Sequence, residues 1–176
     1  MISAMRFNIR DLLWLTLVVG LVTAVWLERR ASPPVRFTGQ PLDVAIAGEG
    51  FFVVTDPATS ASLFTRLGSL TTDSASRLIL SVNNTEFLIN PAIQISPDAT
   101  AISISPTGRV AVQVPDKSDL VAVGQLQLAK FDKPNKLKQV VPALYTDTPE
   151  SGLALLCLPG QDGVATVIQG ALAKRY

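Results

Sequence analysis

The sequence predicts an all-β domain, an irregular β-barrel or β-sandwich, preceded by one apolar N-terminal helix. Beyond residue 38, apolar residues alternate with polar ones at a period of two, a pattern typical of strands that bury one face. Turns rich in Gly, Pro and Asn interrupt these runs, and no long amphipathic pattern of helical period follows residue 31. Many short strands joined by tight turns favour a sandwich or barrel over alternating strands and helices.

The N-terminal apolar segment predicts a membrane anchor. Residues 12–27 read LLWLTLVVGLVTAVWL and hold no charged side chain, whereas arginines lie on both sides of them. As a helix this run is about 24 Å long, close to the ~30 Å hydrocarbon core that snorkelling arginines help to span. We therefore expect a transmembrane helix over residues 12–28, whose lipid contacts come from Leu12, Leu13, Trp14, Val18, Leu21, Val25, Trp26 and Leu27.

The segment leaves two questions open. A secretory signal peptide is the alternative to an anchor, with Val22-Thr23-Ala24 as a small-residue cleavage site and export of the remaining chain. Orientation is weakly encoded because positive charge flanks the segment on both sides. We expect a single-pass cell membrane protein with the β domain outside the cytoplasm.

The chain divides into five parts. Residues 1–11 form a short tail, residues 12–28 the helix and residues 29–37 a linker that Pro33-Pro34 keeps stiff and extended. Residues 38–173 form the β domain, and residues 174–176 a C-terminal tail. Within the domain we expect strands at 42–46, 51–55, 63–66, 78–82, 92–95, 102–104, 110–114, 123–128, 153–158 and 165–172.

Composition excludes several functions. The chain has no histidine, the commonest general base near neutral pH and a frequent metal ligand, so triads and zinc sites of the usual kinds are excluded. A net charge of +1 does not provide the clustered cations that nucleic acid requires. Most aspartates adjoin turn-forming residues, and the single Cys157 lies in an apolar run, where we expect a core thiol. We predict no catalytic, cofactor-binding or metal-binding residue, and no enzyme.

A family resemblance rests on several segments. Residues 38–54, TGQPLDVAIAGEGFFVV, resemble the start of the globular domain of flagellar basal-body rod and hook proteins. In register with that start, FTRLGSL at 64–70, NPAIQI at 90–95, ISISPTGRV at 102–110 and VGQLQLAKF at 123–131 resemble later segments of the same domain. The residues that carry the motif are Thr38, Gly39, Leu42, Asp43, Gly48, Gly50, Phe51, Phe52, Thr65, Arg66, Gly68, Ser69, Gly108, Gly124, Gln169 and Gly170.

The resemblance implies a non-enzymatic structural or interaction protein, accessory to flagellar or envelope assembly. Rod and hook subunits polymerise through terminal helices, whereas here an apolar segment takes the N-terminal position and the chain stops at Tyr176. We therefore expect a tethered β domain with the lipid bilayer and flagellar or envelope proteins as partners, and no ordinary rod assembly. The alternative is an envelope ligand-binding or polysaccharide-binding module on the same scaffold.

Overall fold

The computed structural model describes residues 34–115, 117–161 and 165–174. The predicted membrane helix over residues 12–28, with all eight of its lipid-facing residues, lies outside these ranges, as do the N-terminal tail and residues 29–33 of the linker. Within the described ranges, no helix has the length and apolar character needed to cross a membrane.

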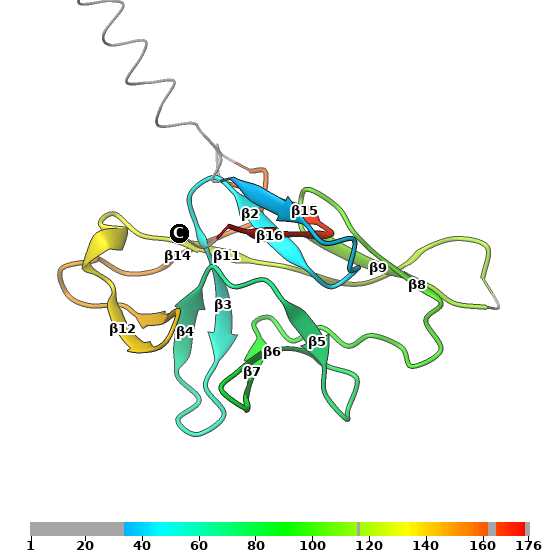
Figure 1. The fold of residues 1–176 in the computed structure, drawn as a ribbon, viewed down its shortest axis with the longest axis horizontal. Coiled ribbons are helices and arrows are strands. Elements are labelled where there is room, and N and C mark those ends of the chain that lie inside the picture. Colours follow the sequence, from blue (N-terminus) through cyan, green and yellow to red (C-terminus); the bar gives the residue numbers. More distant parts are fainter. Residues whose placement is uncertain (1–33, 116, 162–164, 175–176) are drawn as a thin grey trace, which may run out of the picture. The chain divides into compact units, whose positions relative to one another are not determined.

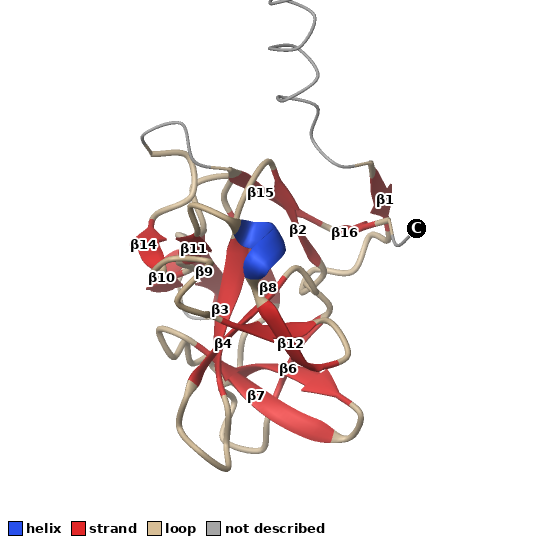
Figure 2. Ribbon diagram, turned by 90° about the vertical axis from the view of Figure 1, so that its left-hand side faces the viewer, coloured by secondary structure: helices blue, strands red, loops and turns tan. Residues whose placement is uncertain are grey.

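The described residues form an all-β fold, as the sequence predicts, and every strand pair in it is antiparallel. A single 3-10 turn, η1 (Pro134–Lys136), is the only helical element in these ranges and stands out among the strands in Figure 2. The strands are β1 Val35–Phe37, β2 Val44–Ala47, β3 Phe51–Thr55, β4 Ser62–Thr65, β5 Leu70–Thr72, β6 Leu78–Val82, β7 Thr85–Ile89, β8 Ala101–Ile104, β9 Arg109–Gln113, β10 Val121–Gln125, β11 Leu128–Lys130, β12 Lys138–Val141, β13 Leu144–Thr146, β14 Leu155–Cys157, β15 Thr166–Gln169 and β16 Ala171–Ala173.

The largest sheet is organised around β3. Its order is β12-β13-β4-β3-β7-β6-β5, and β11 pairs with both β3 and β14 (Figure 1). One edge of β3 pairs with β4 from Phe52 to Thr55, whereas the other edge is shared: β11 pairs with the first two residues of β3 and β7 with its last two. This division lets one five-residue strand join the two ends of the sheet.

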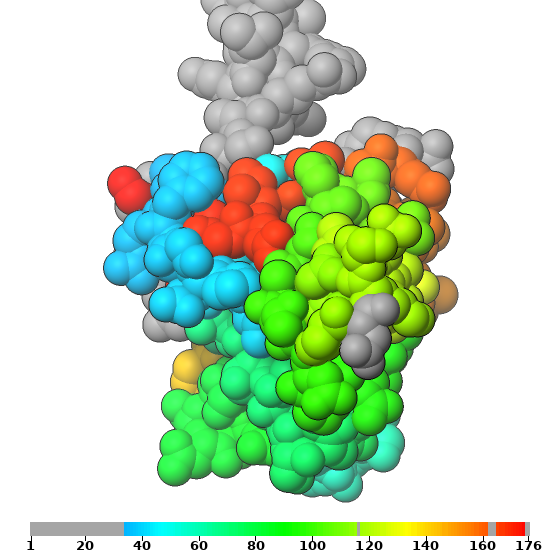
Figure 3. Space-filling model, turned by 90° about the vertical axis from the view of Figure 1, so that its right-hand side faces the viewer, coloured from blue at the N-terminus to red at the C-terminus, as the bar shows by residue number. Residues whose placement is uncertain are grey.

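Three smaller sheets complete the fold. Strands β8, β9 and β10 form a meander, β2 pairs with β15, and β1 pairs with β16. Figure 3 shows the C-terminal strands in red lying beside the segment around residue 40 in blue and the β8–β9 region in green. The two ends of the described chain are therefore closed against each other by strand pairing.

The core follows the alternation seen in the sequence. In β9, residues Val110 and Val112 are buried while Arg109 is exposed, which is the period of two expected for a strand with one buried face. The large side chains with no more than about one-fiftieth of their surface exposed come from β2, β9, the largest sheet and two connecting segments: Phe52, Ile46, Leu78, Leu80, Ile89, Ile93, Leu126, Leu128, Leu144, Val44, Val54 and Val110.

Several predicted boundaries are wrong. Residues 35–37, which the sequence assigned to the linker, form β1 and pair with β16, because β16 offers them backbone partners far away in sequence. The predicted strand 92–95 is absent: it follows a cis Asn90–Pro91 peptide and forms only an isolated bridge from Gln94. The predicted strand 123–128 ends at Gln125 and restarts at Leu128.

Local backbone conformation explains two further differences. The predicted strand 165–172 is divided at Gly170, whose φ of +72° turns the chain between β15 and β16. Strand β7, which the sequence did not predict, pairs with β6 through Asn83-Asn84, both with positive φ. Two consecutive positive φ angles match the twist of a two-residue hairpin, so this turn sets the register of β6 and β7.

Candidate functional site

Arg66 anchors the turn between β2 and β3. Its guanidinium donates to the carbonyl oxygens of Gly50 at 2.8 Å, Gly48 at 2.9 Å and Ile46 at 3.3 Å. Both glycines have positive φ, which turns these carbonyls toward a common donor. Partial burial lowers the pKa of Arg66, an effect that the nearby Glu49 partly opposes. The turn between β2 and β3 is therefore held by the charged side chain of the residue that directly follows β4.

Gly68 allows the chain after β4 to lie directly against β2. The backbone N–H of Val44 donates to the Gly68 carbonyl at 2.8 Å, and Leu70 N–H donates to Leu42 O at 3.1 Å. A Cβ atom at Gly68 would overlap the Val44 carbonyl oxygen and lie 2.7 Å from its carbonyl carbon. Only glycine fits where the two backbones lie this close, so packing alone accounts for the glycine at position 68.

Gln169 ties three segments together near the end of the chain. Its amide nitrogen donates to the carbonyls of Pro41 at 2.8 Å and Ile102 at 2.9 Å, and its amide oxygen accepts from Ile104 N–H at 3.0 Å. The adjoining Gly170 accepts from Thr38 N–H at 2.7 Å and donates to the Asp43 carbonyl at 2.7 Å. These contacts bring the first and last predicted motif segments together.

Other predicted motif residues support turns elsewhere in the fold. Thr65 is fully buried, donates to Ala143 O at 2.7 Å and accepts from Leu67 N–H at 3.0 Å, so it holds the turn before β13. Gly108, with φ of +80°, makes the β8–β9 turn, and Gly124 lies at a bulge of β10. The motif residues therefore support turns and close approaches throughout the fold and do not form one reactive centre.

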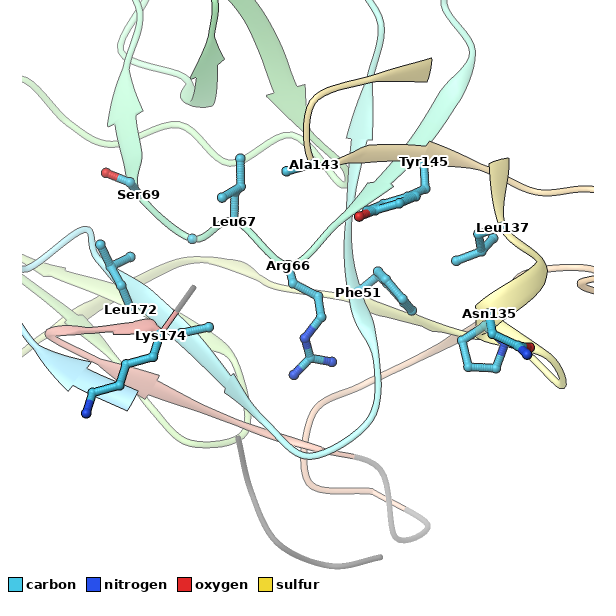
Figure 4. A pocket seen from close by; sticks show the side chains of 13 residues that line it. Phe51, Arg66, Leu67, Ser69, Asn135, Leu137, Ala143, Tyr145, Leu172 and Lys174 are labelled. Carbon is cyan, nitrogen blue, oxygen red and sulfur yellow. The ribbon is translucent and has the colours of Figure 1, made fainter. Parts of the chain in front are cut away.

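A groove opens beside Arg66. It has a volume of about 690 Å³ and lies between the segment after β4, strand β13, η1 and strand β16. Figure 4 shows the Arg66 side chain in the middle, with Leu137 and Asn135 on one side of it and Leu172 and Lys174 on the other. The lining side chains are Phe51, Arg66, Leu67, Ser69, Pro134, Asn135, Leu137, Ala143, Tyr145, Leu172, Ala173 and Lys174, together with the backbone of Gly68.

Aromatic rings form one wall of this groove. Phe51 meets Phe131 edge to face with ring centres 5.9 Å apart and Tyr145 with ring centres 6.2 Å apart. The Arg66 guanidinium carbon lies 6.0 Å from the centre of the Phe51 ring, at the limit for a cation–π contact. A rigid aromatic wall and a fixed cation define a preorganised surface.

A second exposed surface follows strand β14. Leu153, Leu155 and Leu156 are 88%, 66% and 54% exposed, within the run 153–158 that the sequence predicted as a strand with a core thiol at Cys157. Within the described residues β14 pairs only with β11, so its other edge is open. Because the run is apolar at every position, its sequence carried no alternation to show which side chains face solvent. We call Leu153, Leu155 and Leu156 the β14 leucine edge.

Titratable groups form no reactive constellation in the described ranges. Among His, Cys, Asp and Glu side chains there, none cluster in a group of three able to hold a metal ion. Desolvation raises the pKa of the half-buried Cys157 thiol, whose Sγ lies 3.3 Å from Leu128 O. Asp56 and Asp73 cap their own turns, where hydrogen bonds lower the pKa of each carboxyl. The predicted turn aspartates Asp116 and Asp162 lie outside the described residues.

This combination defines a β-rich structural domain that offers surfaces for binding. Residues 45–112 match the family described as flagellar hook protein FlgE/F/G D1 domain. Residues 45–112 are therefore a D1 domain of the flagellar hook and rod type, and the resemblance predicted from the sequence is confirmed.

Relatives with the same family name match most of the chain. The flagellar basal-body rod protein FlgG of Caulobacter vibrioides is 33% identical over 132 residues, 75% of this chain and 49% of that protein. FlgG of Buchnera aphidicola subsp. Baizongia pistaciae is 35% identical over 127 residues, 72% of this chain and 47% of that protein. FlgG of Agrobacterium fabrum is 32% identical over 135 residues, 77% of this chain and 50% of that protein.

This chain spans about half the length of the curated relatives it matches. The matching family is one of non-enzymatic structural proteins, and on that ground the prediction that the chain is not an enzyme is confirmed.

Proposed function

We propose that this chain is a membrane-anchored structural protein whose rod/hook-type β domain, an irregular barrel or sandwich over residues 38–173, docks on a flagellar or envelope protein. The β14 leucine edge is the observation that carries the docking. Exposed apolar patches on soluble domains mark interaction sites, and an unpaired strand edge offers backbone N–H and C=O groups to a further strand. Docking through this edge buries the leucines and at the same time provides hydrogen-bond partners for the free backbone N–H and C=O groups of β14.

The proposed anchor is the transmembrane helix over residues 12–28, with the β domain outside the cytoplasm. Its support is the uncharged run of apolar residues and the flanking arginines. The proposed motif residues serve the family fold: Arg66 holds the β2–β3 turn, Gly68 lets the chain after β4 lie against β2, and Gln169 with Gly170 closes the two ends of the domain.

Alkaline carbonate extraction tests the anchor. We expect the chain to remain in the membrane pellet, and the double substitution Val18→Asp, Leu21→Asp to release it, since each central carboxylate costs about 3 kcal/mol to insert. The control Met5→Asp lies before the apolar run and leaves the chain in the pellet. Extraction of the unsubstituted chain, with an intact mass shortened to begin near residue 25, would show a cleaved signal peptide instead.

Site-specific photocrosslinking tests the docking. A photoreactive amino acid at Leu156 should give a discrete protein adduct in native membranes, identified by mass spectrometry. The matched control replaces Ala58, which is exposed in the β3–β4 turn and distant from β14 (Figure 1), and should give no such adduct. Equal adducts from both positions, or none from Leu156, would contradict a docking role for this edge.

The second candidate is an envelope ligand-binding or polysaccharide-binding module. The groove of about 690 Å³ is the observation in its favour, because small-ligand sites commonly have volumes of roughly 300–1,000 Å³. Specific binding of a soluble oligosaccharide to the purified chain would favour this function over a structural one.

A further inference from the structure

Arg66 has hydrogen-bond donors that its contacts with the β2–β3 turn do not use. Three of the five guanidinium N–H donors bind the carbonyls of the β2–β3 turn. The other two have no acceptor among the described residues. Neither of the two ion pairs found in the same ranges includes Arg66, and no acidic side chain lines the groove. The groove therefore presents a fixed positive charge with donors to spare.

Apolar side chains flank this charge on both sides. Figure 4 shows Leu137 and Tyr145 toward η1 and β13, and Leu172 toward β16, with Arg66 between the two groups. These three flanking side chains are only half-buried, so part of their apolar surface is open to a ligand. A complementary ligand carries one negative charge in its middle and apolar groups on either side.

We propose that this groove binds an extended segment of a partner protein in which apolar residues flank a central Asp or Glu, whose carboxylate pairs with Arg66. An arginine with a fixed orientation recognises a carboxylate well, because charge-assisted hydrogen bonds are stronger than neutral ones. The contacts with Gly50, Gly48 and Ile46 hold the guanidinium in place before the segment arrives. The inference goes beyond the proposed function, since the β14 leucine edge is a separate surface.

Other ligand classes fit this arrangement less well. A single-chain fatty acid carries its carboxylate at one end, whereas Arg66 stands in the middle of the groove. A polysaccharide presents many hydroxyls, and the mostly apolar lining would leave them without hydrogen-bond partners. Nucleic acid carries a charge on every phosphate and requires clustered cations, but the lining supplies only Arg66 and Lys174.

Fluorescence anisotropy with the full chain in lipid nanodiscs tests the proposal. The probe is a fluorescein-labelled pentapeptide, blocked at both ends, with a glutamate between two pairs of leucines. The matched peptide has glutamine in place of the glutamate. Empty nanodiscs correct for partition of the leucines into lipid. We expect the glutamate peptide to bind about tenfold more tightly, because the charge-assisted bond to Arg66 is lost with glutamine.

Two substitutions locate the binding. Leu172→Glu places a carboxylate on the groove wall and leaves Arg66 and its turn contacts intact, so we expect roughly tenfold weaker binding of the glutamate peptide. The control Leu120→Glu makes the same chemical change at a leucine that is 52% exposed and lies outside both the groove and the β14 leucine edge, and it should leave affinity unchanged. Arg66→Gln should remove the preference for glutamate, with circular dichroism to check that the domain is folded.

Several results would overturn the proposal. Equal affinity for the two peptides would exclude a carboxylate pairing with Arg66, and an unchanged affinity of Leu172→Glu would place the peptide elsewhere. Binding of soluble cellohexaose, reduced by Leu172→Glu, without peptide binding would assign the groove to a saccharide. None of these outcomes depends on crosslinking at Leu156, so the groove and the docking edge fail or succeed separately.

Discussion

The substitution Gly68→Ala tests the packing of β2 against the segment after β4. The new Cβ would overlap the Val44 carbonyl oxygen, lie 2.7 Å from the carbonyl carbon and lie 3.2 Å from the Phe52 ring. A contact with backbone cannot be relieved by a rotamer change, so the 66–70 segment must move away from β2.

The structure sets the magnitude of this loss. Moving the segment breaks the hydrogen bonds from Val44 N–H to Gly68 O and from Leu70 N–H to Leu42 O, each contributing about 0.5–1.5 kcal/mol. Overpacking of a well-filled region adds roughly 1–3 kcal/mol. We therefore expect Gly68→Ala to lower the free energy of unfolding by about 2–6 kcal/mol.

Urea unfolding of the full chain in mild detergent, followed by circular dichroism, measures the effect through the midpoint and its slope. The control is Gly39→Ala: Gly39 has φ of +73°, but a Cβ atom there would meet no heavy atom within 4 Å, so only backbone strain of about 1–2 kcal/mol applies. Equal midpoints for the two variants would refute the close approach at Gly68, because the clash would then add nothing beyond strain.

Three further predictions follow from single contacts. Gln169→Leu removes three hydrogen bonds at similar volume and should cost about 1.5–4.5 kcal/mol in urea unfolding, while a neutral result would refute its tying role. Thr65→Val leaves the Ala143 carbonyl without its buried donor and should cost about 1–3 kcal/mol, whereas Thr65→Ser should stay close to the native protein. Hydrogen bonds from the backbone and side chain of Arg77 lower the pKa of Asp73 below 3.8, so its stabilisation is present above pH 3.8 and lost as the pH falls through the folded pKa. Amide hydrogen exchange in β5–β6 should accelerate there, and Asp73→Asn should remove this acid-dependent step.

Strand positions were predictable wherever the apolar period was clear. In β9, buried Val110 and Val112 alternate with more exposed neighbours, and the strand lies within one residue of its predicted start and end. Strand β3 has its predicted bounds because glycines bend the chain immediately before it and Asp56-Pro57 follows. In these elements, the local sequence encodes both the conformation of the strand and the turn residues that begin and end it.

Long-range pairing was not predictable in the same way. Strand β1 has only three residues, and its identity as a strand depends on β16, more than 130 positions later. The exposure of Leu153, Leu155 and Leu156 depends on β14 lying at an edge of the sheet, which an apolar run cannot reveal. Sheet order, which sequence pattern does not encode, decides both cases.

The motif residues show a related limit. Sequence alone placed Arg66 within a family motif, but its bonds to three carbonyls and its position in the groove arise from the fold. Gln169 lies 128 positions from Pro41, so no local pattern could join them. The residues of the groove come from five separate stretches of the chain and had no shared signal in the sequence.

Affinity capture of the tagged full chain from its native membranes, followed by quantitative mass spectrometry, tests the central claim most directly. The comparison is with Leu156→Asp, an exposed position whose charge should disturb docking and not folding. We expect flagellar basal-body or neighbouring envelope proteins to be enriched with the native chain and depleted with Leu156→Asp. A protein profile that is the same for both chains, with no flagellar or envelope component enriched, would contradict a docked rod-type domain.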